Sequence, residues 1–237
     1  MSGMNTKPYQ DWAEENLGYK FDNLDLLVTA FTHRSYMNEH KKSAREHNER
    51  LEFLGDAVLE LATTRFLYLN FDEPEGVLTS WRSSLVRTES ISAAGAALGY
   101  ASLIRMSRGE KQGSERARAQ ILANAFEALI GAIYLDKGYD AAEKFITEHI
   151  LTKLDDILAA GSWRDPKSHL QEVSQRIDNQ TPIYRVLSEE GPDHDKTFVV
   201  GAYVNSKLMG RGQGSSKQMA QQEAAKKALE AYKKRTG

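Results

Sequence analysis

Apolar residues recur at intervals of three and four through most of the first 160 positions, the pattern of amphipathic helices packed on a common core. Strand-like alternation of apolar and polar residues is nearly absent there. Helices are predicted over Leu24–Thr32, Glu49–Leu69, Leu78–Leu98, Arg118–Asp136 and Tyr139–Leu158. We therefore expect the first part of the chain to form an all-helical domain.

The pattern changes near position 161, where small residues, Gly161 and Pro166 end one helical stretch and start another. A helix is predicted over Ser168–Ile177, followed by three strands and a closing helix. These last elements are expected at Pro182–Glu189, Lys196–Val204, Lys207–Gly212 and Ser216–Lys233. The prediction is a helical domain at 1–160, a linker at 161–165 and a small α-β-β-β-α domain at 166–237.

Composition narrows the class of protein. The 237 residues are 41% hydrophobic and 27% charged, as in ordinary globular proteins. The absence of cysteine excludes a disulfide scaffold, a thiol nucleophile and a thiolate metal site. No apolar run approaches the roughly 20 residues of a membrane-spanning helix, and the first residues lack a signal-peptide core. We expect a cytoplasmic protein with no membrane partner.

The net charge of −2 conceals a difference between the two parts of the chain. Residues 165–237 carry 12 Lys or Arg and nine Asp or Glu, a net charge of +3, whereas the first 164 residues carry a net charge of −5. An acidic body followed by a mildly basic tail indicates separate tasks, although +3 alone does not establish nucleic-acid binding.

Acidic residues share one side of the second predicted helix. At about 100° per residue, Glu49, Glu52 and Asp56 fall within about 60° of one another, and Glu60 extends this stripe by a turn. The flanking Leu, Phe and Val residues predict burial nearby, where clustered carboxylates are costly unless they are protonated or neutralised by a cation. The alternative is a solvated helix face.

A similar feature stands in the sequence ILANAFEALIGAIY at 121–134, where Glu127 is the only charged residue and Asn124 lies one turn before it. The alternative is an Asn–Glu hydrogen bond on a solvated face. Two such helices in one domain favour a shared site, and oxygen ligands without cysteine fit Mg²⁺ or Mn²⁺ better than zinc. Such ions support hydrolysis of a phosphodiester. The sequence has no Gly-x-Ser-x-Gly elbow, which would indicate a serine hydrolase. It also has no Gly-rich phosphate loop, which would indicate a nucleotide cofactor.

The stretch Asn48–Leu59, NERLEFLGDAVL, resembles the signature motif of the ribonuclease III family, and LANAFEALIGAIYLD at 122–136 resembles its second catalytic helix. The tail is similar to a double-stranded-RNA-binding domain in element order, in the sequence GPDH at 191–194 and in GSSK at 214–217. The resemblance, over roughly residues 10–235, implies a Mg²⁺-dependent endonuclease of double-stranded RNA that acts as a homodimer, with Mn²⁺ as a substitute. It also implies 5′-phosphate and 3′-hydroxyl ends, two-nucleotide 3′ overhangs and a role in RNA processing, including that of ribosomal RNA.

The resemblance assigns roles by position. Glu52, Asp56 and Glu127 match metal-binding acids, with Asn124 at a fourth metal position. Asp56 and Glu127 are also expected to be catalytic, together with Glu49, which matches an acid near the scissile phosphate.

Two further positions concern a second subunit. Glu75 resembles an acid contributed beside the partner's site, and Phe53 is similar to an aromatic residue that inserts into the partner. From the hydrophobic pattern alone, ordinary core packing is an equal expectation for Phe53.

Asn124 departs from the family's Asp-x-x-Glu pattern. Asparagine keeps a carbonyl oxygen but lacks the negative charge, so Mg²⁺ binding should weaken while RNA binding survives. The first alternative function is therefore a catalytically silent dimer that binds double-stranded RNA. A second is a metal-dependent hydrolase of small phosphate esters.

RNA-binding residues are expected on the tail and in a basic loop at 105–118. Duplex RNA is recognised through its 2′-hydroxyls and phosphates. Those expected to contact RNA are Gln171, Glu172, Gln175, His194, Ser215, Ser216, Lys217, Arg108 and Lys111. Related domains often carry a second lysine directly after Lys217, where this chain has Gln218, so the expected affinity is modest.

Overall fold

The computed structural model describes residues 5–40, 46–161, 163–192 and 196–236. The chain divides into two compact units, Met1–Gly161 and Ser162–Gly237. The predicted RNA-binding residue His194 lies outside the described residues. Within the described ranges, no helix is both long enough and apolar enough to cross a bilayer.

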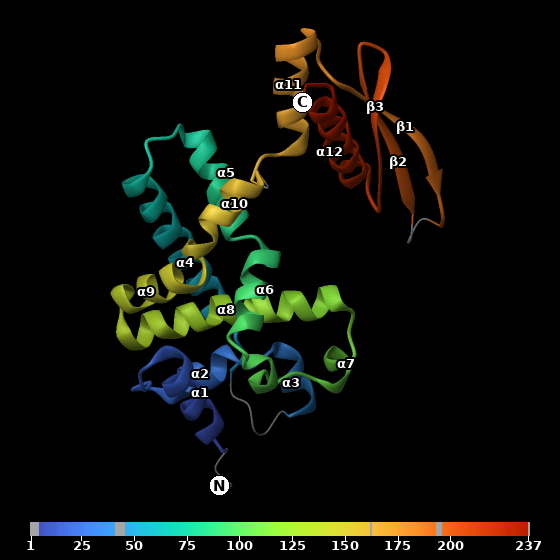
Figure 1. Ribbon diagram of the computed structural model, residues 1–237. Helices are drawn as coiled ribbons and strands as arrows, with labels where there is room; N and C mark the ends of the chain where they lie inside the picture. Colours follow the sequence, from blue (N-terminus) through green and yellow to red (C-terminus); the bar gives the residue numbers. More distant parts are fainter. Residues whose placement is uncertain (1–4, 41–45, 162, 193–195, 237) are drawn as a thin grey trace. The chain divides into compact units, whose positions relative to one another are not determined.

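The first unit is helical, as predicted, and in its described part the only pairing of strand type is an isolated bridge between Thr32 and Arg105. Figure 1 shows α8 at its centre, with α2, α4, α6 and α9 packed around it. The elements are α1 (Lys7–Leu17), α2 (Leu24–Ala30), α3 (Arg34–Glu39), α4 (Glu49–Asn70), α5 (Glu75–Leu85), α6 (Thr88–Ala97), η1 (Tyr100–Leu103), α7 (Arg108–Lys111), α8 (Glu115–Lys137), α9 (Tyr139–His149), η2 (Leu151–Lys153) and α10 (Leu154–Ala160).

Two glycines allow the backbones of α4 and α8 to touch where the helices cross. A Cβ atom on Gly55 would lie 1.7 Å from the carbonyl oxygen of Glu127, and one on Gly131 would lie 2.3 Å from the carbonyl oxygen of Leu51. Neither position accepts a side chain without separating the helices. The crossing therefore fixes which residues of α4 face which residues of α8.

Two of the predicted helices are wrong because each is interrupted. The helix expected over Leu78–Leu98 is α5 and α6, separated where the backbone of Arg87 is extended (ψ 152°). The helix expected over Tyr139–Leu158 becomes α9, η2 and α10, because the backbone at Ile150 departs from helical geometry (φ −116°). Neither break contains glycine or proline, the residues by which a sequence indicates an interruption.

Short helices were also missed. The region 105–118, expected to be a loop, contains α7 and the first turn of α8. α8 begins at Glu115 because the hydroxyl of Ser114 accepts a hydrogen bond from the N–H of Ala117. α1 was not predicted, although Tyr9 and Trp12 within it are buried.

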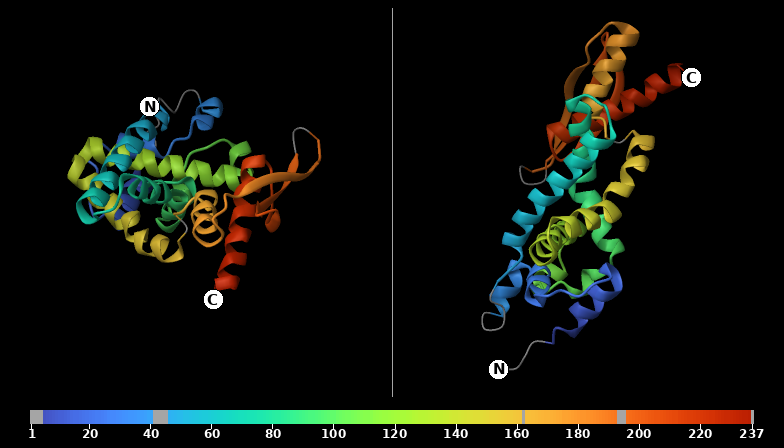
Figure 2. Two further views of the ribbon diagram at one scale, coloured as in Figure 1. Left: turned by 90° about the horizontal axis from the view of Figure 1, so that it is seen from above. Right: turned by 90° about the vertical axis from the view of Figure 1, so that its left-hand side faces the viewer.

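The second unit has the predicted α-β-β-β-α order, with α11 (Pro166–Asp178), β1 (Ile183–Glu190), β2 (Thr197–Val204), β3 (Lys207–Gly214) and α12 (Lys217–Thr236). The strands form an antiparallel sheet in the order β1-β2-β3. Both helices lie on one side of the sheet, with α11 beside α12 (Figure 2). Gly161, at φ +63°, ends α10, and Asp165 caps α11 ahead of Pro166.

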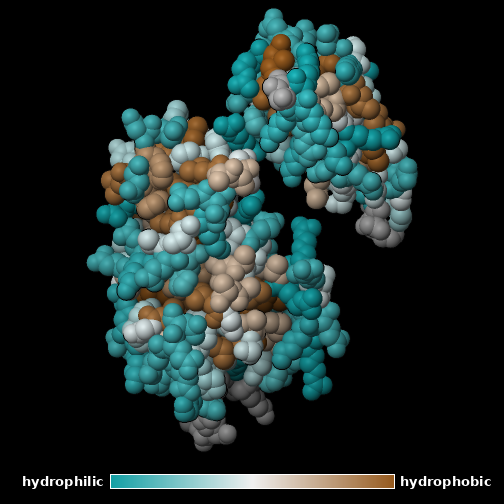
Figure 3. All heavy atoms as spheres, viewed as in Figure 1, coloured by the Kyte–Doolittle hydropathy of each residue, from teal (hydrophilic) through white to brown (hydrophobic). Residues whose placement is uncertain are grey.

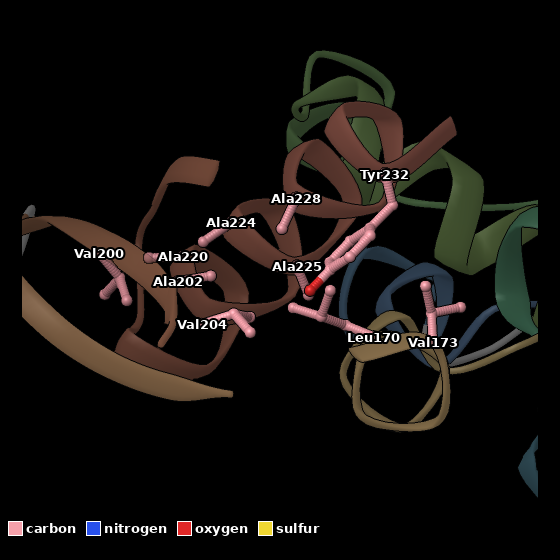
Figure 4. Packing of buried hydrophobic residues seen from close by; sticks show 10 residues of the cluster. All are labelled: Leu170, Val173, Val200, Ala202, Val204, Ala220, Ala224, Ala225, Ala228 and Tyr232. Carbon is pink, nitrogen blue, oxygen red and sulfur yellow. The ribbon is translucent and has the colours of Figure 1, made fainter. Parts of the chain in front are cut away.

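Small side chains bring α12 close to the sheet. Ala220, Ala224 and Ala228 are fully buried against a core that includes Val200 and Leu170 (Figure 4). Figure 4 also shows the ring of Tyr232 pointing from α12 toward Leu170 on α11. This core holds the starts of α11 and α12, where the RNA-binding residues were predicted, on one scaffold.

Candidate active site and RNA-binding surface

The acids of α4 and α8 interact across the helix crossing. Asn124 on α8 donates a side-chain hydrogen bond to the carboxylate of Glu52 on α4. The side-chain oxygen of Asn124 accepts a hydrogen bond of 2.7 Å from Nε2 of Gln120. One turn further along α8, the carboxyl of Glu127 experiences the charges of both Asp56 and Glu52. The two predicted acidic stripes therefore form one cluster.

Burial and like charge act together on this cluster. Burial, followed by the charges of Asp56 and Glu52, raises the pKa of Glu127 to about 7. Burial and the charge of Glu49 also raise the pKa of Glu52, against the opposing effect of its hydrogen bond from Asn124. Glu52 and Glu127 are half-buried and Asp56 is exposed. A fully solvated face, the alternative for both helices, is therefore wrong for Glu52 and Glu127.

The cluster is open rather than a closed coordination shell. In the part of the chain that the structure describes, no group of three or more His, Cys, Asp or Glu side chains is already arranged to hold a metal ion. Glu52, Asp56, Asn124 and Glu127 all present oxygen atoms, the ligand type that Mg²⁺ and Mn²⁺ prefer. Because backbone contact fixes the two helices, side-chain rotation is the movement available for these donors to converge on an ion.

Two other acids of α4 have cationic partners of their own. Glu49 is exposed at the start of the helix, 3.4 Å from the guanidinium of Arg34 and 3.8 Å from His47. Glu60, which continues the acidic stripe, forms a 2.9 Å ion pair with Arg82 of α5. The stripe predicted from helical spacing therefore has a cationic partner at each end, whereas Glu52 and Asp56 between them have none among the described residues.

The predicted RNA-binding residues of the second unit lie at the surface. Gln171, Glu172 and Gln175 are exposed on α11. At the start of α12, the hydroxyl of Ser216 accepts a hydrogen bond from the N–H of Met219, and Ser215 contacts the sulfur of Met219.

Lys217, the first residue of α12, is already paired. Its ammonium lies 2.8 Å from the carboxylate of Glu189 on β1, and this contact lowers the pKa of Glu189. The ammonium also lies 5.4 Å from the ring centroid of Phe198. This pairing could not be predicted from the sequence, because Glu189 is 28 positions away and meets Lys217 only through the fold.

Comparison with known proteins finds a family match for each of the two units. Residues 23–154 match the family model described as Ribonuclease-III-like, and residues 166–232 match the Double-stranded RNA binding motif. The Ribonuclease 3 of Enterococcus faecalis is 46% identical over 220 residues, covering 91% of this chain and 94% of that protein. The Ribonuclease 3 of Oceanobacillus iheyensis is 45% identical over 218 residues, covering 92% and 95%. This chain belongs to the ribonuclease III family.

A solved structure supports the same assignment for the first unit. The nuclease domain of Ribonuclease III from Campylobacter jejuni is 37% identical, with a TM-score of 0.52, and the match covers 59% of this chain and 96% of that one. The first unit is thus a ribonuclease III-type endoribonuclease domain, and a double-stranded-RNA-binding domain follows it.

Within this ribonuclease III fold, Glu75 lies far from the acids of its own chain. It is exposed at the start of α5, beyond the end of α4. The helix rises about 1.5 Å per residue, so the 18 residues from Glu52 to Asn70 span roughly 27 Å. Glu75 instead lines a groove of about 800 Å³ formed by the end of α4 and the start of α5.

Phe53 is 81% exposed, so core packing, the alternative for this residue, is wrong for the single chain. Leu61 and Tyr68 are 57% and 75% exposed on the same side of α4. Figure 3 shows apolar side chains gathered at the surface around the α4–α5 end of this unit. One face of α4 thus carries large apolar groups that the single chain leaves uncovered.

The basic segment of the nuclease unit is also exposed. Arg108 and Lys111 lie on α7, which Ser107 anchors by donating its backbone N–H to the hydroxyl of Ser35 at 3.0 Å. The segment continues directly into α8, which carries Asn124 and Glu127.

Sequence reasoning missed Gly55 and Gly131, which determine how the acids meet. The available signal was a glycine inside each apolar helix, because such glycines often mark close approach of another backbone.

Proposed function

We propose that this chain hydrolyses phosphodiester bonds of double-stranded RNA as a Mg²⁺-dependent homodimer. The observation that carries the proposal is the α4–α8 crossing, which brings Glu52, Asp56 and Glu127 together beside Asn124. The double-stranded-RNA-binding domain supports a duplex as the substrate. Each protomer cuts one strand, leaving 5′-phosphate and 3′-hydroxyl ends with two-nucleotide 3′ overhangs, in RNA processing in the cytoplasm.

The donor set fits a hard divalent cation. Glu52, Asp56, Asn124 and Glu127 would hold Mg²⁺, and Mn²⁺ suits the same oxygen ligands. When bound, the ion supplies activation of water and neutralisation of charge on the phosphate. Crowded, partly buried carboxylates with no ion-pair partner among the described residues are the environment that such a cation relieves.

The protein's own groups supply position and proton transfer. Asp56 and Glu127 orient the attacking water and accept its proton. Glu49, exposed at the start of α4 beside Arg34, lies on the solvent side, where an RNA backbone approaches. Arg108 and Lys111 attract that backbone toward an otherwise acidic site.

A second copy explains the features that one chain leaves unused. Glu75 is too far from the acids of its own chain to act there, so it serves beside the partner's site. The exposed face of α4 with Phe53, Leu61 and Tyr68 supports pairing through this helix. The solved nuclease domain from C. jejuni has a region involved in dimer formation.

Asn124 favours one rival function, a catalytically silent dimer that binds double-stranded RNA. Replacing this residue by aspartate restores a carboxylate among the metal donors. We therefore expect Asn124→Asp to raise the cleavage rate at fixed Mg²⁺ on the order of tenfold, measured on an end-labelled duplex. Asn16→Asp on α1 is the matched control, and an unchanged rate in Asn124→Asp would refute this role for position 124.

The proposed function is tested by incubating the full chain with a long labelled RNA duplex, with and without Mg²⁺ or Mn²⁺. Discrete short products that require metal are expected. Intact but retarded RNA, even with Mn²⁺, would establish the silent binding protein instead. Hydrolysis of a small phosphate ester that duplex RNA does not inhibit would establish the small-ester hydrolase.

A further inference from the structure

A polar hollow of about 330 Å³ lies between α11, the start of β1 and the start of α12. Its lining includes Lys167, Ser168 and Gln171 from α11, together with Gln218 from α12. Gln171 was predicted to contact RNA, and Gln218 follows Lys217 directly. The hollow is therefore part of the surface on which RNA recognition by this unit was expected.

The side-chain ammonium of Lys167 brings a positive charge to this hollow. Its Nζ donates a 2.7 Å hydrogen bond to Oε1 of Gln221 and lies 5.1 Å from the ring centroid of Tyr184. Both contacts are with neutral groups, and they hold the ammonium beside α12 rather than leaving it free in solvent. Lys167 is half-buried, so its position is fixed more firmly than that of an exposed lysine.

Across the described ranges, no carboxylate forms an ion pair with Lys167. Asp165 also lines the hollow, but its carboxylate accepts hydrogen bonds from the backbone N–H and the hydroxyl of Ser168, at 2.9 and 3.0 Å, and caps α11. Lys217, by contrast, is paired with Glu189 at 2.8 Å.

We propose that Lys167 is a phosphate-binding residue for duplex RNA, with the hollow beside Gln171 and Gln218 receiving a backbone phosphate oxygen. An ammonium among amide and hydroxyl donors suits a phosphate, which accepts several hydrogen bonds. Lys167 supplies a positive charge next to Gln218, the position where a second lysine was expected. The inference rests on the proposed function, because it takes duplex RNA as the ligand.

The test measures binding of the full chain to a labelled RNA duplex without metal, so that cleavage does not interfere. Dissociation constants are determined over a series of salt concentrations for the wild type, Lys167→Gln, Lys167→Arg and Lys226→Gln. Lys226, exposed on α12 of the same unit, is the matched control because its substitution removes the same charge. Thermal unfolding of each variant shows whether the fold is retained.

We expect Lys167→Gln to weaken binding about threefold to tenfold at 0.1 M salt and to lower the slope of log K against log salt by about one. Lys167→Arg should keep the wild-type slope, and Lys226→Gln should change it less than Lys167→Gln does. Equal effects of Lys167→Gln and Lys226→Gln would overturn the proposal, and so would weaker binding with an unchanged slope. If the wild type itself fails to bind duplex RNA, the proposed function fails, which is a separate outcome.

Discussion

In the nuclease unit, backbone contact between α4 and α8 holds like charges together. In the RNA-binding unit, by contrast, contacts with other side chains position the lysine ammonium groups at the exposed starts of the helices. The backbone of Glu127 cannot move away from the helix that carries Asp56 and Glu52 unless the helices separate. Lys217 is held by a side-chain ion pair with Glu189, which can break without any change of the backbone. Under the proposed function, the packed site needs an added cation, whereas the exposed surface adjusts its affinity for RNA through its own acids.

The largest effect is expected from breaking the helix contact. In Gly55→Ala, the new methyl group meets the backbone of Glu127, so α4 and α8 must separate. We expect the free energy of unfolding to fall by about 3 kcal/mol and cleavage to be lost. Urea unfolding and the duplex assay measure the two effects.

Gly76→Ala is the matched control for Gly55→Ala. It also adds a methyl group inside a helix, α5, but finds no atom within 4 Å. Its unfolding free energy should stay within about 1 kcal/mol of the wild type. If both variants behave alike, the close contact does not hold the site together.

A smaller effect is expected from removing the side-chain hydrogen bonds that join α11 to α12 in the RNA-binding unit. Asp178 at the end of α11 accepts hydrogen bonds from Tyr232 and Arg235 of α12, and these bonds lower the pKa of Asp178. Because the pKa is lower in the folded state, the stabilisation is present above the unfolded pKa of about 3.9 and is lost as the pH falls through the folded pKa. Asp178→Asn should therefore lower the urea midpoint at pH 7, and the difference from the wild type should narrow toward pH 3. A difference independent of pH would show that the charge of Asp178 is not its cause.

The smallest effect concerns the partner of Lys217. Glu189→Gln removes the acid that competes with RNA for this lysine. We expect duplex RNA to bind roughly twofold to fivefold more tightly at 0.1 M salt, measured by fluorescence anisotropy. Glu230→Gln removes an equal charge from an exposed position of α12 and should have a smaller effect. Equal gains in the two variants would mean that net charge, rather than release of Lys217, governs affinity.

The sequence predicted the helical unit, the order of the second unit and the residues of the acidic cluster, because these follow from local periodicity and from motifs. The break between α5 and α6 was not predictable from glycine or proline, since Val86 and Arg87 are ordinary helix residues. The exposure of Phe53 was equally unpredictable from the sequence. An apolar helix face has the same pattern whether it packs on its own core or against a second chain.

The central claim is that acids from α4 and α8 hold one cation between them. This claim is tested by titrating the full chain with Mn²⁺ in the absence of RNA and measuring the binding by calorimetry. The titration is carried out on the wild type, Glu127→Gln and Glu60→Gln. Binding should weaken at least about tenfold in Glu127→Gln and stay unchanged in Glu60→Gln, because Glu60 is paired with Arg82. Equal Mn²⁺ affinity in the wild type and Glu127→Gln would contradict the claim.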